Sequence, residues 1–229
     1  MLSQLLNTVI PQSCLLCGNR GQGDRLVCSG CESDLPWLGH HCSVCATPLP
    51  ANAPDTCGQC QRKSPAYDYT QALFHYTSPV DKLITGLKFN SRLVNARMLG
   101  DIMAAKIQAN TLDRPEALLP VPLHRQRLRE RGFNPALELA RPLAKAWDIP
   151  LLKEPVRRIR ATTAQMELPA KQRHQNIRGA FECDTSLPYG HIAIVDDVVT
   201  TGATANELAK LLKKQGIRIV QIYAIARAS

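Results

Sequence analysis

The chain has 229 residues, 45% of them hydrophobic, and a formal net charge of +9 at pH 7. This composition allows one ordinary hydrophobic core with a small module beside it, and it excludes a disordered chain. No apolar run reaches the roughly 20 residues of a membrane helix, and the N-terminus lacks the basic region of a signal peptide. We therefore expect a cytoplasmic protein without membrane insertion.

The positive charge is unevenly distributed along the chain. Residues 1–66 contain four Lys/Arg and four Asp/Glu, so the whole excess lies beyond residue 66. Between His124 and Arg178, thirteen Lys/Arg stand against five Asp/Glu. Such a block favours phosphate-bearing partners, either small phosphate esters or nucleic acid, although a solvated basic face would have the same composition.

Cysteine dominates the first third of the chain. Eight of the nine cysteines form four C-x-x-C pairs, and Cys183 stands alone as an ordinary strand residue. Two such pairs supply the four thiolates of a structural Zn²⁺ site, and four regular pairs disfavour a redox pair or an iron–sulfur cluster. The predicted ligands of two structural zinc ions are Cys14, Cys17, Cys28, Cys31, Cys42, Cys45, Cys57 and Cys60.

The spacing of these pairs indicates their order. Ten residues separate the first two pairs and eleven the last two, which favours two zinc ribbons in series. Spacing alone leaves an interleaved arrangement open. We expect a double zinc ribbon over residues 1–66 that folds only with metal, followed by a second domain over residues 67–229.

Beyond residue 66, strand-like and helix-like segments alternate, which predicts an α/β fold with a parallel sheet flanked by helices. We expect strands at 69–76, 117–122, 180–183, 191–197 and 217–228, with a further candidate at 149–152. We expect helices at 78–89, with Ser78 as N-cap, and at 93–109, 134–147 and 205–216. Residues 157–178 show no periodicity.

The stretch HIAIVDDVVTTGAT, residues 191–204, carries the strongest functional signal. A parallel strand would deliver Asp196 and Asp197 to the carboxyl edge of the sheet, where α/β proteins bind ligands. Two adjacent carboxylates suit a pair of ribose hydroxyls and can approach Mg²⁺. The following hydroxyl-rich turn, with Gly202 allowing close approach, suits a terminal phosphate at the N-terminus of the next helix.

The segment VDDVVTTGAT resembles the phosphoribosyl pyrophosphate motif of type I phosphoribosyltransferases. The resemblance implies that Asp196 and Asp197 hold the ribose hydroxyls and serve as the catalytic acids. It also implies that the next residues hold the 5-phosphate. Those residues are Val199, Thr200, Thr201, Gly202, Ala203 and Thr204.

Further segments resemble the ComF family, which includes the GntX proteins: LKF at 87–89, PVPLH at 120–124, RGFNPALELA at 131–140 and TTAQMEL…NIRGAF ending at Phe181. This resemblance implies a type I phosphoribosyltransferase-like domain behind a cysteine module. It also implies a role in competence, meaning uptake or use of DNA, with single-stranded DNA and proteins of the uptake machinery as partners.

Other parts of the site follow from the same resemblance. The loop after the strand at 117–122 would hold pyrophosphate, with Arg125 and Arg127 as its cations, although a solvated basic turn is an equally good interpretation. Gln165 would belong to a loop that closes over the substrate. Lys88 would meet a phosphate, although an exposed lysine at a helix end is an equally good interpretation.

Two functions remain open at this stage. One is binding of phosphoribosyl pyrophosphate and single-stranded DNA in DNA uptake. The alternative is a Mg²⁺-dependent phosphoribosyltransferase acting on an unknown acceptor. No set of residues that would recognise a base can be identified. A hood over the sheet edge would have to come from residues 67–110 or from the zinc module.

Overall fold

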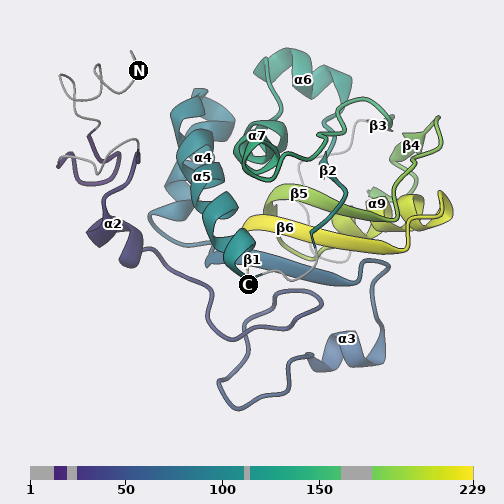
Figure 1. Cartoon of the computed structure of the whole chain (residues 1–229), viewed down its shortest axis with the longest axis horizontal. Coiled ribbons are helices and arrows are strands. Elements are labelled where there is room, and N and C mark those ends of the chain that lie inside the picture. The colour runs from purple at the N-terminus through teal and green to yellow at the C-terminus, as the bar shows by residue number, and fades with distance from the viewer. Residues whose placement is uncertain (1–12, 20–24, 111–113, 161–176, 229) are drawn as a thin grey trace.

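The computed structural model describes residues 13–19, 25–110, 114–160 and 177–228 (Figure 1). Its centre is a four-stranded sheet in the order β1-β6-β5-β2, in which every neighbouring pair is parallel. The strands are β1 (Tyr69–His75), β2 (Ala117–Pro120), β5 (His191–Val199) and β6 (Ile219–Arg227). The predicted fold class, a parallel sheet flanked by helices, is confirmed.

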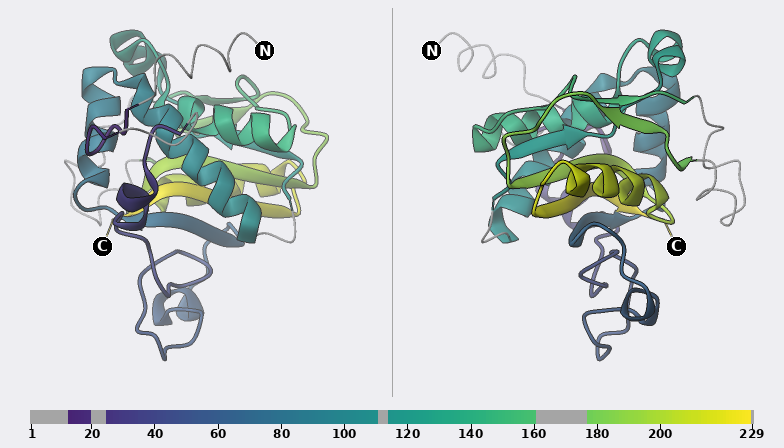
Figure 2. Two further views of the ribbon diagram at one scale, coloured as in Figure 1. Left: turned by 60° about the vertical axis from the view of Figure 1, so that its left-hand side comes forward. Right: turned by 90° about the vertical axis from the view of Figure 1, so that its right-hand side faces the viewer.

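Helices cover both faces of this sheet, so its central strands are apolar on both sides. Ala193 and Val195 of β5 belong to the core that lies under three helices, whereas Ile192 and Ile194 belong to the core on the opposite face. The three helices are α4 (Val80–Asn90), α5 (Leu93–Asn110) and α7 (Pro135–Trp147). The opposite face is covered by α9 (Ala203–Lys214), as Figure 2 shows.

The first residues of α7 and α4 are capped in different ways. The helix expected at 134–147 is α7, and its first expected residue, Asn134, is the N-cap, because its side chain accepts a hydrogen bond from the Ala136 N–H at 3.1 Å. The expected cap of α4 at Ser78 is wrong. That helix begins at Val80, with Pro79 in the cap position and no side-chain capping bond.

Two further elements differ from expectation. The segment after β2, expected to be a loop, forms helix α6 (Arg125–Arg131), which has no buried residue and therefore no apolar periodicity to reveal it. The segment expected as a strand at 180–183 is β4 (Phe181–Cys183), but it pairs antiparallel with β3 (Val156–Arg158) outside the main sheet.

The cysteine-rich segment is attached to the sheet through its middle. The Leu38 N–H donates to the Leu73 carbonyl at 2.7 Å, and the His75 N–H donates to the Pro36 carbonyl at 2.8 Å, so residues 36–38 run along β1. The rings of Trp37 and Phe74 lie 4.5 Å apart. The division at residue 66 stays a prediction.

The two cysteine groups lie on either side of this attachment. The first, with helix α2 (Ser29–Ser33), lies beside α4 and α5, and the second, with helix α3 (Gly58–Arg62), projects below the sheet (Figures 1 and 2). Over the described residues, the chain has no helix of the length and apolarity required to cross a bilayer.

Candidate functional site

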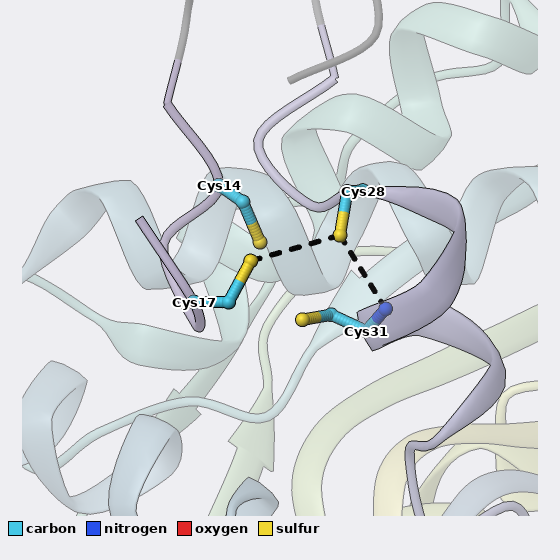
Figure 3. A group of neighbouring side chains, drawn as sticks. All are labelled: Cys14, Cys17, Cys28 and Cys31. Carbon is cyan, nitrogen blue, oxygen red and sulfur yellow. Dashed lines mark hydrogen bonds between the residues drawn. The ribbon is translucent and has the colours of Figure 1, made fainter. Parts of the chain in front are cut away.

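The eight paired cysteines form two groups of four in chain order. Within each group the four Sγ atoms lie within 4.8 Å of one another, and Figure 3 shows three of the thiols of the first group turned toward a common centre. The groups are Cys14, Cys17, Cys28 and Cys31, and then Cys42, Cys45, Cys57 and Cys60. The pairs are therefore arranged in series, and the interleaved alternative is excluded.

The surroundings of these thiols suit zinc. The Cys28 Sγ accepts from the Cys31 N–H at 3.4 Å, as thiolates do in zinc knuckles. Burial opposes ionisation of Cys14, but backbone N–H groups lower its pKa to about 6. Burial and the neighbouring thiols raise the pKa of Cys60. Four thiolates in so small a space need a divalent cation between them, and four sulfurs in tetrahedral reach are the ligand set of a structural Zn²⁺.

The acid pair lies at the carboxyl end of β5, as predicted. The two side chains follow five fully buried residues of the strand, and Asp197 is 8% exposed. Asp196 Oδ1 accepts the Asp197 N–H at 2.8 Å. Burial and the adjacent carboxylate raise the pKa of Asp196 to about 7, because two neighbouring negative charges removed from water are costly.

One cation is already present beside this pair. The Lys88 Nζ lies 2.7 Å from Asp197 Oδ1, and the two side chains are 16% and 12% exposed. Burial disfavours the ammonium, but Asp197 raises the pKa of Lys88 above its usual value, so the lysine stays charged. The interpretation of Lys88 as an exposed helix-end lysine is therefore wrong.

The hydroxyl-rich loop connects β5 to the N-terminus of α9. Gly202 has φ +73° and precedes the first residue of the helix, Ala203, whose N–H donates to Thr201 Oγ1 at 3.4 Å. A helix N-terminus carries unpaired N–H groups and a partial positive charge, which favour an anion.

The region of the second cysteine group covers this loop. An added Cβ on Gly202 would lie 2.7 Å from the hydroxyl oxygen of Tyr67, so this position requires glycine for space as well as for φ. Burial raises the pKa of Tyr67, and its hydroxyl stays protonated. The Asn206 side chain of α9 accepts the Ala66 N–H at 2.8 Å.

Arg227, the last residue of β6, joins the second cysteine group to the loop. Its Nε donates to the Cys45 carbonyl at 3.0 Å, and its Nη2 donates to Thr47 Oγ1 at 2.9 Å. Its Nη1 donates to the carbonyls of Val199 and Thr200. One guanidinium therefore fixes the start of the loop against the turn that carries a zinc ligand.

The acid pair, Lys88, the hydroxyl-rich loop and Arg227 line one cavity of about 1760 Å³. That is larger than the roughly 300–1,000 Å³ of most small-molecule sites, so it has room for more than one ligand. Nine Lys or Arg residues line it against three acids. The cations are Arg62, Lys63, Lys88, Arg127, Arg131, Arg158, Arg178, Lys210 and Arg227.

The remaining predicted site residues are placed as follows. Thr200, Thr201, Gly202 and Thr204 line the cavity together with the acid pair. Val199, the last residue of β5, and Ala203, the first residue of α9, are buried, 4% and 1% exposed. Arg125 is exposed at the start of α6 and is not among the described cavity-lining residues, whereas Arg127 is one of them. Gln165 lies outside the described residues.

The sequence reading missed Arg227 and Tyr67. Arg227 ends an apolar strand, and this is the signal that identified the acids of β5, so the same reasoning applied to β6 would have found it. Tyr67 is one of few aromatic residues near the expected boundary but carries no motif.

Comparisons with known proteins agree with the cysteine chemistry. The family model "Double zinc ribbon domain" matches residues 5–61. A solved purine phosphoribosyltransferase from Pyrococcus horikoshii is 20% identical with a TM-score of 0.33, over 57% of this chain and 80% of that one.

Relatives match over nearly the whole chain. Competence protein F of Haemophilus influenzae is 36% identical over 94% of this chain and 96% of its own length. The DNA utilization protein YhgH of Salmonella typhi is 34% identical over 88% and 90%. Competence protein ComFC of Bacillus subtilis is 27% identical over 84% and 80%. With its two zinc ribbons and the acid pair at the end of β5, the chain belongs to the ComF/GntX family of competence and DNA utilization proteins.

Proposed function

We propose that this protein acts in the uptake or use of DNA by binding phosphoribosyl pyrophosphate, or a similar sugar phosphate, at the carboxyl end of β5. One observation carries the proposal: an acid pair and a phosphate-type loop open into the same strongly basic cavity. Competence proteins and DNA utilization proteins among its relatives support the biological role.

Different residues would bind different parts of the ligand. Asp196 and Asp197 accept hydrogen bonds from the ribose hydroxyls, and the N–H groups of residues 201–204 hold the 5-phosphate. Arg127 and Arg131, which also line the cavity, pair with the diphosphate. Mg²⁺ would neutralise the diphosphate, with the acid pair as its nearest carboxylate ligands.

The alternative is that the bound ligand reacts. A phosphoribosyltransferase breaks the bond between the ribose C1 and the diphosphate, releases pyrophosphate and joins C1 to an acceptor. The carboxylates would stabilise the positive charge that develops on the ribose ring. The acceptor would occupy the part of the cavity between the loop and the second zinc ribbon.

A single strand of nucleic acid is the second proposed ligand. The excess of cations in the cavity favours a polyanion. Phe89 is 70% exposed at the cavity wall and is the kind of surface on which a base stacks. Proteins of the DNA-uptake machinery are the proposed macromolecular partners.

Calorimetric titration with phosphoribosyl pyrophosphate and Mg²⁺ tests the proposed function. Wild type should bind, and the double variant Asp196→Ala, Asp197→Ala should lose about 2–4 kcal/mol, given about 1.5–3 kcal/mol for one charge-assisted hydrogen bond and incomplete additivity. Equal affinity in both proteins would place the site elsewhere. Release of pyrophosphate on addition of candidate acceptors would favour the enzyme.

Fluorescence anisotropy with a labelled oligonucleotide tests the nucleic-acid ligand. Arg127→Glu, in the cavity, should weaken binding and lower its salt dependence. Arg129→Glu changes the same charge on the exposed outer face of α6 and should have a smaller effect. Equal effects of the two variants would show that only the general charge of the helix matters.

A further inference from the structure

The ion pair between Lys88 and Asp197 is unusual in its position. The two residues are 109 positions apart in the sequence, and the lysine reaches from the last turn of α4 to the end of β5. Both side chains are largely buried. A lysine at a helix C-terminus normally extends into solvent, where the helix dipole stabilises it at little desolvation cost.

The electrostatics explain why the lysine is held inside. The Asp197 carboxylate and the neighbouring Asp196 both attract the ammonium of Lys88. Arg131 also interacts with Asp197 through its charge, and Arg158 interacts with Asp196 in the same way. The Lys88 ammonium is in direct contact with the pair, because its Nζ lies 2.7 Å from Asp197 Oδ1.

This contact competes with a metal ion. Mg²⁺ binds carboxylate oxygens at about 2.0–2.1 Å, so an ion on Asp197 Oδ1 would lie within about 5 Å of the ammonium nitrogen. Asp196 Oδ1 also accepts a hydrogen bond from the Asp197 N–H. With little water between them, the divalent cation and the ammonium would repel each other strongly.

We propose that Lys88 is the counter-ion of the acid pair. In the free protein it keeps divalent cations away from Asp197. When an anionic sugar phosphate binds, the Lys88 ammonium moves away from Asp197 and pairs with the phosphate. The metal would then enter only together with the phosphate ester. The first half of this inference is independent of the proposed function, and the second half rests on it.

Mn²⁺ binding to the zinc-loaded protein, measured by electron paramagnetic resonance without any phosphate compound, tests the first half. Mn²⁺ takes the oxygen ligands that Mg²⁺ takes and does not compete for cysteine sites. Lys88→Met should bind one Mn²⁺ at least about tenfold more tightly than wild type, because the acid pair has lost its cation. Lys88→Arg, which keeps the charge, should behave like wild type.

Two controls locate the effect. Lys82→Met removes a charge from an exposed position of the same helix and should leave Mn²⁺ affinity unchanged. Adding Asp197→Asn to Lys88→Met should abolish the gain. Zinc content and thermal unfolding establish that each variant is folded, and Lys88→Gln replaces Lys88→Met if the latter is not. An unchanged Mn²⁺ affinity on removal of the lysine would overturn the inference.

Ribose 5-phosphate then tests the second half. It should tighten Mn²⁺ binding to wild type about fivefold more than to Lys88→Met, since only wild type has an ammonium to release. Equal tightening would overturn the exchange of partners. If the sugar phosphate binds neither protein while Lys88→Met still gains Mn²⁺ affinity, the proposed function fails and the counter-ion role stands.

Discussion

The two zinc ribbons have the same local structure but different surroundings. In each, the residue four positions after the first cysteine has a positive φ and donates its N–H to the backbone carbonyl of that cysteine. Gly18 donates to the Cys14 carbonyl, and Ala46 donates to the Cys42 carbonyl. Gly18 is exposed, with nothing within 4 Å of an added Cβ. Ala46 is 0% exposed and belongs to the core on the α9 side.

This difference indicates a division of roles. A left-handed alanine costs about 1–2 kcal/mol, and its two neighbours in the chain, Cys45 and Thr47, line the cavity. The first ribbon instead places Leu26, Val27 and Leu35 in the core beneath α4 and α5, away from the loop. We infer that the first ribbon stabilises the helical face and the second positions the sugar-phosphate loop.

Removal of one zinc ligand from each ribbon should give the largest contrast. Cys42→Ser should lower affinity for ribose 5-phosphate by at least about tenfold, or about 1.4 kcal/mol, because the turn that supports the loop loses its metal. Cys14→Ser, an equally buried ligand, should leave that affinity within about twofold. Metal analysis should find one Zn²⁺ in each variant and two in wild type. Equal losses of affinity would remove the distinction.

Arg227→Met should have the next largest effect. It removes the hydrogen bonds to the Cys45 and Val199 carbonyls, each worth about 0.5–1.5 kcal/mol, so affinity for the sugar phosphate should fall about fivefold with both zinc ions retained. The matched control is Arg25→Met in the first ribbon, where Arg25 pairs with Glu32. Loss of zinc from Arg227→Met would mean that the arginine supports the metal site and not the loop.

The smallest effect is expected from Tyr67→Phe. The hydroxyl lies over Gly202, but the buried ring supplies most of the contact, so ribose 5-phosphate affinity should change by no more than about threefold. Tyr67→Ala should lower it further, because the cavity left behind would free the loop. A loss on Tyr67→Phe as large as that on Arg227→Met would show that the hydroxyl itself binds the ligand.

Much of the fold and of the site follows from local sequence signals. The C-x-x-C spacing predicts two zinc sites in series, and the structure groups the cysteines in that way. Strand-like segments that alternate with helix-like segments predict the parallel sheet. The apolar strand that ends in Asp196 and Asp197 predicts which edge of the sheet carries the acid pair.

The rest depends on contacts between distant segments. Arg227 meets Cys45 across 182 positions and Lys88 meets Asp197 across 109, and neither partner carries a motif for the other. Helix α6 could not be predicted because none of its residues is buried, so its sequence has no apolar periodicity. The antiparallel pairing of β4 with β3 likewise depends on tertiary contacts, and short apolar runs in the sequence do not predict it.

The most direct test of the central claim is an amide ¹H–¹⁵N spectrum of the zinc-loaded protein titrated with ribose 5-phosphate. The account predicts saturable shifts of the N–H signals of residues 201–204, and their loss in Gly202→Val, whose side chain would collide with Tyr67. Gly39→Val, at an open and exposed position, should keep the wild-type response. Loop amides that do not move, with shifts confined to another part of the molecule, would contradict the assignment of this loop as the phosphate site.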